Sequence, residues 1–182
     1  PGPSRKFTVR NNYYEPYGAA PGGFQAVSWR AFRATQGLGG SGRTRRDLNK
    51  AYELCRPRDD DDHSVDRYQL DLRNTLGKIH LYREQFEDAE QVFSTNLESA
   101  QLVNDGSHQA KALINLGVVF LQQGFADKAL TQFETVKDHC TKEGDVPHLA
   151  VALENLAVLH YRRQAFKQAL VFYHRSRAST EA

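Results

Sequence analysis

A fixed spacing of 40 residues relates three consecutive parts of this 182-residue sequence. Ala89, Ala129 and Ala169 are separated by this interval, and each lies where small and apolar residues recur at helical spacing. A period of about 20–50 residues is typical of a solenoid, in which each unit buries its apolar face against its neighbours. Three further sets of residues keep the same interval: Leu76, Leu116 and Leu156; Gly77, Gly117 and Ala157; and Phe93, Phe133 and Tyr173.

Each unit is expected to fold as two consecutive helices, so the predicted fold class is all-α. Gly124 marks the tight turn inside the middle unit, because glycine commonly ends a helix. Ser107 is expected to cap the next helix, and Pro147 suits the first turn of the helix after that. The expected helix pairs are 65–82 with 86–103, 107–123 with 126–142, and 148–163 with 166–179.

The middle unit resembles the tetratricopeptide repeat. Its key positions are matched in order by Leu116-Gly117, Phe120, Gly124, Ala129, Phe133 and Val136. The resemblance covers about residues 65–180, and the period of 40 in place of 34 is similar to the longer-helix variety of kinesin light chains and Pins-type adaptors. It implies an α-solenoid of three helix pairs that form a right-handed superhelix with a concave inner wall. The other units match at Leu76-Gly77, Phe86, Ala89 and Phe93, and at Leu156-Ala157, Phe166, Ala169 and Tyr173.

In that family the first helix of each pair lines the concave wall, and residues separated by 4, 3 and 4 share its face. Asn115 and Asn155 recur at one such position, where an amide that donates and accepts suits the backbone of an extended peptide. A solvated or inter-helix role for these two residues is the alternative. A clamp for a terminal carboxylate is not expected, since Asn74 and Glu154 stand where basic residues would be needed. The predicted partner-binding residues are Lys78, Tyr82, Lys111, Asn115, Gln122, Asn155 and Arg162.

An arm over residues 1–43 precedes the array and differs from it in charge. Residues 1–50 carry nine Lys or Arg against two acidic residues, a net charge of +7, whereas the whole chain carries +2. Proline and glycine interrupt the arm, yet it is rich in aromatic residues, which favours an extended segment that binds neighbouring chains over a flexible tail. The predicted arm contacts are Arg5, Lys6, Arg10, Tyr13, Tyr14, Tyr17, Trp29, Arg30 and Arg33.

Residues 44–64 are expected to form a short helix near 46–55 and an acidic linker, and residues 65–182 the array. The linker lacks the glycine and glutamate of a calcium-binding loop. Residues 37–44 match a phosphate-binding loop except that Arg43 replaces lysine, and no strand precedes them. His139 and Cys140 are adjacent on one helix and make a poor base–nucleophile pair. The chain is therefore predicted to be non-catalytic, without cofactor or metal.

His80 and His160 stand where the family usually has an aromatic residue, and packing explains them better than a metal site. The last predicted helix carries Leu170, Phe172 and Tyr173, and no polar capping helix follows it. We therefore expect residues 165–177 to be covered by more chain or by another subunit.

The predicted function is a protein–protein interaction scaffold within a large multi-subunit assembly of cytoskeletal or ciliary type. An RNA-contacting structural subunit of a ribonucleoprotein, such as a mitochondrial ribosome, is the alternative, because a basic aromatic arm suits RNA as well as an acidic tubulin surface. No apolar run is long enough to cross a membrane, and two cysteines are too few for a disulfide framework. An intracellular location is expected, in the cytoplasm or on the cytoskeleton, with the mitochondrion as the alternative.

Overall fold

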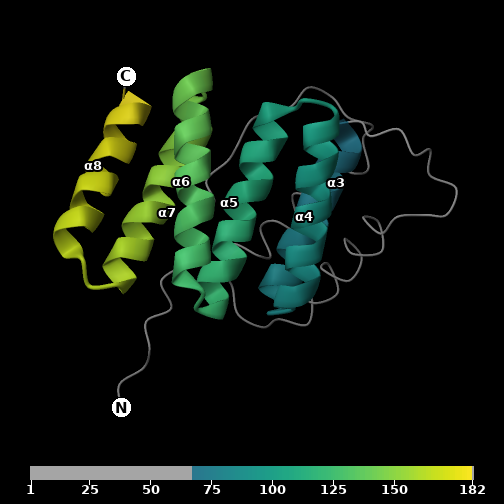
Figure 1. Cartoon of the computed structure of the whole chain (residues 1–182), viewed down its shortest axis with the longest axis horizontal. Helices are drawn as coiled ribbons and strands as arrows, with labels where there is room; N and C mark the ends of the chain where they lie inside the picture. Colours follow the sequence, from purple (N-terminus) through teal and green to yellow (C-terminus); the bar gives the residue numbers. More distant parts are fainter. Residues whose placement is uncertain (1–66, 182) are drawn as a thin grey trace, which may run out of the picture.

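The computed structural model describes residues 67–181, which form six α-helices and, within that part of the chain, no strand (Figure 1). The all-α prediction is confirmed, and each helix end lies within two residues of its expected position. The predicted arm, short helix and acidic linker lie outside the described residues. The pairs are α3 (Arg67–Tyr82) with α4 (Phe86–Leu102), α5 (Gly106–Gln123) with α6 (Ala126–Glu143), and α7 (Val146–Arg162) with α8 (Phe166–Glu181).

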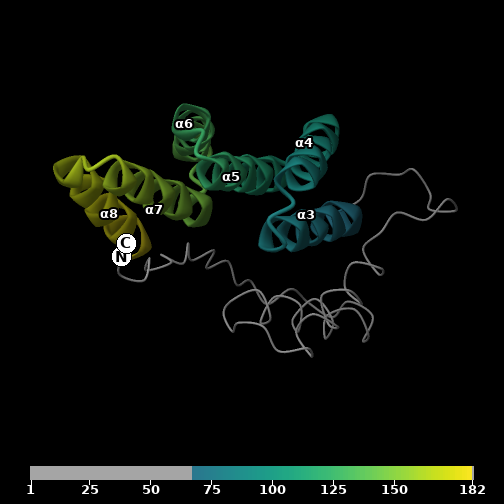
Figure 2. The same ribbon diagram turned by 90° about the horizontal axis from the view of Figure 1, so that it is seen from below.

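The helices form two layers that curve into an arch. Figure 2 shows α3, α5 and α7 on the inner side of the arch and α4 and α6 on the outer side. Within the described residues, α5 contacts both α3 and α7, whereas α4 and α6 make no mutual contact. Because the inner helices of successive pairs contact one another and the outer helices α4 and α6 do not, the outer helices splay apart and the array curves.

Helix α5 has the most buried surroundings, since it packs against α3, α4, α6 and α7. Every residue from Ile114 to Leu121 is buried. A helix that is covered on so many sides can expose few side chains, which explains why this stretch is apolar nearly all round. Its only polar member is Asn115.

In the first two pairs, an aromatic ring of the second helix packs over a glycine of the first helix. Phe93 and Phe133 are fully buried, and each ring occupies the space beside a glycine of the preceding helix, Gly77 or Gly117. Burial of one such ring contributes about 1.5–3 kcal/mol. The third pair departs from this arrangement, because Ala157 replaces the glycine and the side chain of Tyr173 is 49% exposed.

The turns inside the pairs share one backbone conformation. Glu84, Gly124 and Gln164 occupy equivalent positions 40 residues apart, with φ angles of 60°, 88° and 61°. Only glycine adopts this left-handed region without steric cost, so the first and third turns are strained where the middle one is relaxed.

The caps of α5 and α7 correct one expectation and confirm another. Asp105, and not Ser107, caps α5, because its Oδ1 accepts a hydrogen bond from the His108 backbone N–H at 3.1 Å. Asp145 caps α7 in the same way, and Pro147 stands in the first turn as expected. A carboxylate at this position satisfies an otherwise unpaired N–H and complements the positive end of the helix dipole.

Candidate partner-binding face

The predicted wall residues lie on the inner helices, and the most exposed of them stand at the C-terminal ends of those helices. We call this side the inner face. Tyr82 is 40% exposed, and Gln122 and Arg162 are also exposed. Asn115 and Asn155, near the middle of their helices, are only 3% and 2% exposed. The inner face is defined by Asp71, Thr75, Lys78, Tyr82, Lys111, Asn115, Val118, Gln122, Val151, Asn155, Val158 and Arg162.

The two equivalent asparagines have different partners. Asn115 Nδ2 donates to Oδ1 of Asn74 on α3 at 2.6 Å, which links the first two inner helices. Asn155 Nδ2 donates within its own helix, to the carbonyl of Val151 at 3.0 Å. The residue equivalent to Asn74 one repeat later is Ile114, which has no hydrogen-bonding group. Asn155 Nδ2 therefore has no side-chain acceptor at that position, and Asn155 Oδ1 is buried without a hydrogen-bond partner within the described residues.

A polar cluster that the sequence reasoning missed joins α3 to the start of α5. The ring of His108 is buried between two carboxylates, with Nε2 lying 3.1 Å from Asp71 Oδ1 and Nδ1 lying 3.1 Å from Asp105 Oδ2. Asp105 also pairs with Arg67 at 3.0 Å, and Lys111 Nζ lies 3.9 Å from Asp71. The sequence contained a signal for this cluster. The three-residue spacing from Asp105 to His108 recurs 40 residues later at Asp145 and His148.

The pKa of the Asp71 carboxyl reflects opposing influences. Burial alone would raise this pKa, but the hydrogen bond with His108 and the positive charge of Lys111 outweigh it, and the pKa falls below its ordinary value. Asp71 is therefore ionised at neutral pH and already shared between a histidine and a lysine.

Lys78 differs from the other charged residues of the inner face. Its side chain is half-buried, and it forms no ion pair or hydrogen bond within the described residues. Burial, followed by the positive charge of Lys111, lowers the pKa of its ammonium group to about 8, although Asp71 acts in the opposite direction. Asp71 therefore acts on Lys78 from beyond ion-pair distance, while its direct contacts are with His108 and Lys111.

Arg162 is oriented by the preceding repeat. Its Nη1 donates to the carbonyl oxygen of Leu121, near the C-terminal end of α5, at 3.1 Å. A cation at this end of a helix is favoured by the negative end of the dipole. The guanidinium is thereby held next to Gln122 at the exposed edge of the inner face.

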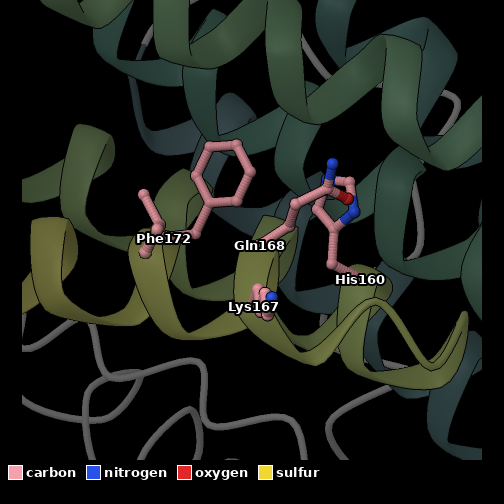
Figure 3. A pocket seen from close by; sticks show the side chains of 5 residues that line it. His160, Lys167, Gln168 and Phe172 are labelled. Carbon is pink, nitrogen blue, oxygen red and sulfur yellow. The ribbon is translucent and has the colours of Figure 1, made fainter.

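The outer side of α8 is the second candidate contact region. Leu170, Val171 and Tyr173 are roughly half exposed, at 56%, 57% and 49%, and so is Phe166. A shallow hollow of about 420 Å³ opens where α7 meets α8, and the side chains of His160, Gln168 and Phe172 point to the same side of the ribbon there (Figure 3). Lys167 and Val171 complete its lining.

Neither of the two unusual histidines gathers metal ligands around it. His80 is buried, with Nδ1 lying 3.3 Å from Gln85 Oε1, and the ring of His160 stacks on Phe172 at a centroid distance of 5.2 Å. In residues 67–181 no three His, Cys, Asp or Glu residues come together as a metal site would require. Burial raises the pKa of the Cys140 thiol to about 12, and Asp145 adds to this effect, so the thiol is unreactive at neutral pH.

The predicted arm contacts, from Arg5 to Arg33, lie before the described part of the chain. Among the helices that the structure describes, none combines the length and the apolar character that a membrane span requires.

Stacked antiparallel helix pairs with an inner and an outer layer define an α-solenoid of the class that binds other proteins. Residues 108–182 match the family model of the tetratricopeptide repeat. Residues 108–182 therefore contain tetratricopeptide repeats, as the sequence predicts.

One solved structure with a similar fold is the crystal structure of aspartyl phosphate phosphatase F from Bacillus subtilis, with a TM-score of 0.60 and 15% sequence identity. The match covers 87% of this chain and 41% of that chain. At this identity the likeness concerns the fold alone. The search of curated proteins finds no match.

Proposed function

We propose that this chain is a non-catalytic interaction scaffold that holds other protein subunits within a multi-subunit assembly. The observation that carries the proposal is the state of α8. In the preceding repeat, Leu130 and Phe133 pack in one cluster with Leu156 of the following pair. Their equivalents in the last repeat, Leu170 and Tyr173, are about half exposed. A neighbouring subunit or further chain over residues 165–177 would bury them as the third pair buries α6.

The inner face supports a second contact, with an extended segment of a partner. Tyr82, Gln122 and Arg162 form its exposed edge, and Lys78 and Lys111 add positive charge beside it. Asn115 and Asn155 lie deeper, so their proposed contribution is to fix the inner helices on which the exposed residues stand.

The setting that we propose is cytoskeletal or ciliary, with the basic arm of residues 1–43 bound to neighbouring chains. An acidic tubulin surface and an RNA both fit the net charge of +7 in residues 1–50. Co-sedimentation of the full chain with microtubules, beside an electrophoretic shift assay with RNA, separates these two targets. Replacing Arg5, Lys6 and Arg10 with glutamine should weaken binding to the true target and reduce its dependence on salt.

Site-specific photo-crosslinking in cells tests the scaffold proposal. A photoreactive amino acid is placed at Tyr82 or Gln122 on the inner face, at Leu170 on α8, and at the exposed outer residue Thr135 as the control. The inner and α8 positions should each give adducts with defined polypeptides, which mass spectrometry identifies, and Thr135 should not. Adducts no more abundant than those of Thr135 at all three positions would contradict the proposal.

Light scattering provides a second measurement that does not depend on identifying the partner. The chain is compared with and without residues 1–43, and with Leu170→Glu. Concentration-dependent association that Leu170→Glu reduces would support an α8 contact. A chain that remains monomeric at every concentration and salt concentration, and that gives no crosslink, would contradict the scaffold interpretation.

A further inference from the structure

We propose that the hollow between α7 and α8 is a binding site for single-stranded nucleic acid, in which one base stacks beside the rings of His160 and Phe172. The cations that we assign to the flanking phosphates are Lys167 and Arg175. This contact goes beyond the protein–protein contacts proposed above, and it lies on the last helix pair and not on the basic arm.

The hollow lies where the first two pairs have a contact between a charged side chain and a ring. In the first pair, Oδ2 of Asp88 lies 3.6 Å from Nδ1 of His80. In the second pair, the ammonium group of Lys128 lies over the ring of Phe120, 5.2 Å from its centroid. The equivalent residue of the third pair is the uncharged Gln168, which lines the hollow of about 420 Å³. The third pair thus has an opening where the other two have a direct contact.

The lining of the hollow suits a flat, aromatic ligand. The rings of His160 and Phe172 are stacked, with centroids 5.2 Å apart and planes that differ by 10°. Both rings line the hollow, and Gln168 points to the same side as they do (Figure 3). A base that enters can extend this stack, and stacking on aromatic side chains is the common means of holding single strands. The Gln168 amide can both donate to and accept from the edge of such a base.

The charge of the surrounding surface favours a polyanion. Residues 155–180 contain five Lys or Arg and no Asp or Glu. Three positions of α8 that are uncharged or basic, Lys167, His174 and Ala178, are equivalent to three acidic positions of α6. Those positions of α6 are Asp127, Glu134 and Asp138. A phosphate backbone therefore meets several cations and no carboxylate along this stretch.

The arrangement of the cations favours a strand over a free nucleotide. Lys167 lines the hollow itself. Arg175 is exposed and follows Val171, another lining residue, by four positions, so it continues the same face of α8 beyond the hollow. Lys167 and Arg175 are eight residues apart, which is roughly 12 Å along a helix. A strand presents successive phosphates along this line, whereas a free nucleotide presents its charge at one point.

Fluorescence anisotropy on the full chain tests the proposal with two matched probes. The first probe is a labelled ten-nucleotide oligothymidylate. The second is a strand of ten abasic deoxyribose units, which has the same phosphates and no bases. Replacing His160 with alanine should weaken binding of the oligothymidylate about tenfold and binding of the abasic strand less than twofold, because it removes a stacking ring and no phosphate contact.

Variants of exposed residues separate the hollow from the basic arm, which also attracts nucleic acid. Gln168→Glu places a carboxylate at the hollow and should weaken oligothymidylate binding about tenfold. Lys167→Met and Arg175→Met should each weaken it and lower the slope of log affinity against log salt by about 0.7. Lys142→Met, which removes an exposed lysine at the end of α6, should change the affinity less than twofold. Circular dichroism of each variant verifies that the helices are intact.

Four results would overturn the inference. Equal affinity of the wild-type chain and Gln168→Glu would place binding on the arm or elsewhere. Equal effects of His160→Ala on the two probes would exclude base stacking. Thymidine monophosphate that binds as tightly as the oligomer would make the hollow a site for a free nucleotide. A peptide of alternating glycine and glutamate that binds as tightly and is weakened equally by Lys167→Met would make it a site for acidic proteins. Leu170 does not line the hollow, so the crosslinks at Leu170 test the proposed function separately.

Discussion

The ring of Phe93 takes the space that a side chain on Gly77 would need. Its Cε1 atom lies 2.5 Å from the position that a Cβ atom on Gly77 would occupy, a separation that real Cβ contacts essentially never show. The glycine is therefore required by the packing of α4 on α3, and the same relation holds between Phe133 and Gly117.

Gly77→Ala should destabilise the array although alanine favours helices. The methyl group must displace a fully buried ring, and overpacking of this kind costs about 1–3 kcal/mol. Urea unfolding measures the loss. The reverse change in the third repeat, Ala157→Gly, is the matched control and should cost no more than about 1 kcal/mol through helix propensity. Equal losses at the two positions would contradict the packing described here.

Asn115→Ala should cost more stability than Asn155→Ala. The first change leaves Oδ1 of buried Asn74 without its donor, and an unsatisfied buried group costs about 1–3 kcal/mol. The second change removes an acceptor that already lacks a partner within the described residues. Thermal unfolding of the two variants compares them directly, and the double variant Asn74→Ala/Asn115→Ala should recover part of the loss. A larger loss for Asn155→Ala would show that its Oδ1 is bonded in solution.

Lys78→Met should stabilise the free protein at neutral pH. The pKa of Lys78 falls from 10.5 to about 8 on folding, so folding disfavours its charged form below pH 8. This penalty lessens as the pH rises from about 8 to 10.5 and is absent above that range. The half-buried side chain moderates it to on the order of 1–3 kcal/mol. Urea unfolding at pH 7 and pH 10 should therefore show the gain of the variant shrinking with pH, and a constant gain would contradict the assignment.

Glu84→Gly and Gln164→Gly should each stabilise the chain by about 0.5–1 kcal/mol. Both residues adopt the left-handed conformation that Gly124 adopts at the equivalent position, and glycine removes the steric cost. Gly124→Ala should destabilise by a similar amount, although no atom lies within 4 Å of its added Cβ. Differential scanning calorimetry of the three variants checks the signs, and a destabilised Glu84→Gly would show that the turn is unstrained.

The sequence was sufficient to predict the helices, because the spacing of its apolar residues and the glycine and proline residues at helix ends indicate the same boundaries. Gly124 and Pro147 stand at helix ends, and the 40-residue period fixes which apolar residues face one another. The cap of α5 was misassigned because both Asp105 and Ser107 are good capping residues, and only the backbone path decides between them. The period would have favoured Asp105, since Asp145 is its counterpart.

The side chains of the inner face were harder to predict. Asn115 and Asn155 look identical in the repeat, yet their partners depend on residues of the preceding helix, Asn74 and Ile114. Lys78 showed no distinguishing pattern in the sequence, because its environment depends on Lys111 and Asp71, and Asp71 also contacts His108. Such sharing joins side chains of α3 and α5 and is not contained in any one repeat.

The restriction of contacts to neighbouring pairs determines where the array opens first. Within residues 67–181, the pair α3–α4 makes no contact with α7–α8, so the two ends are joined only through α5 and α6. Local unfolding can then begin at α8 without breaking any contact of α3 or α4. Amide hydrogen exchange should accordingly be slowest in α5 and become faster toward α8, whose neighbours cover it on one side only. A subunit bound over Leu170 and Tyr173 would slow exchange in that helix and give the last repeat the surroundings of an internal one.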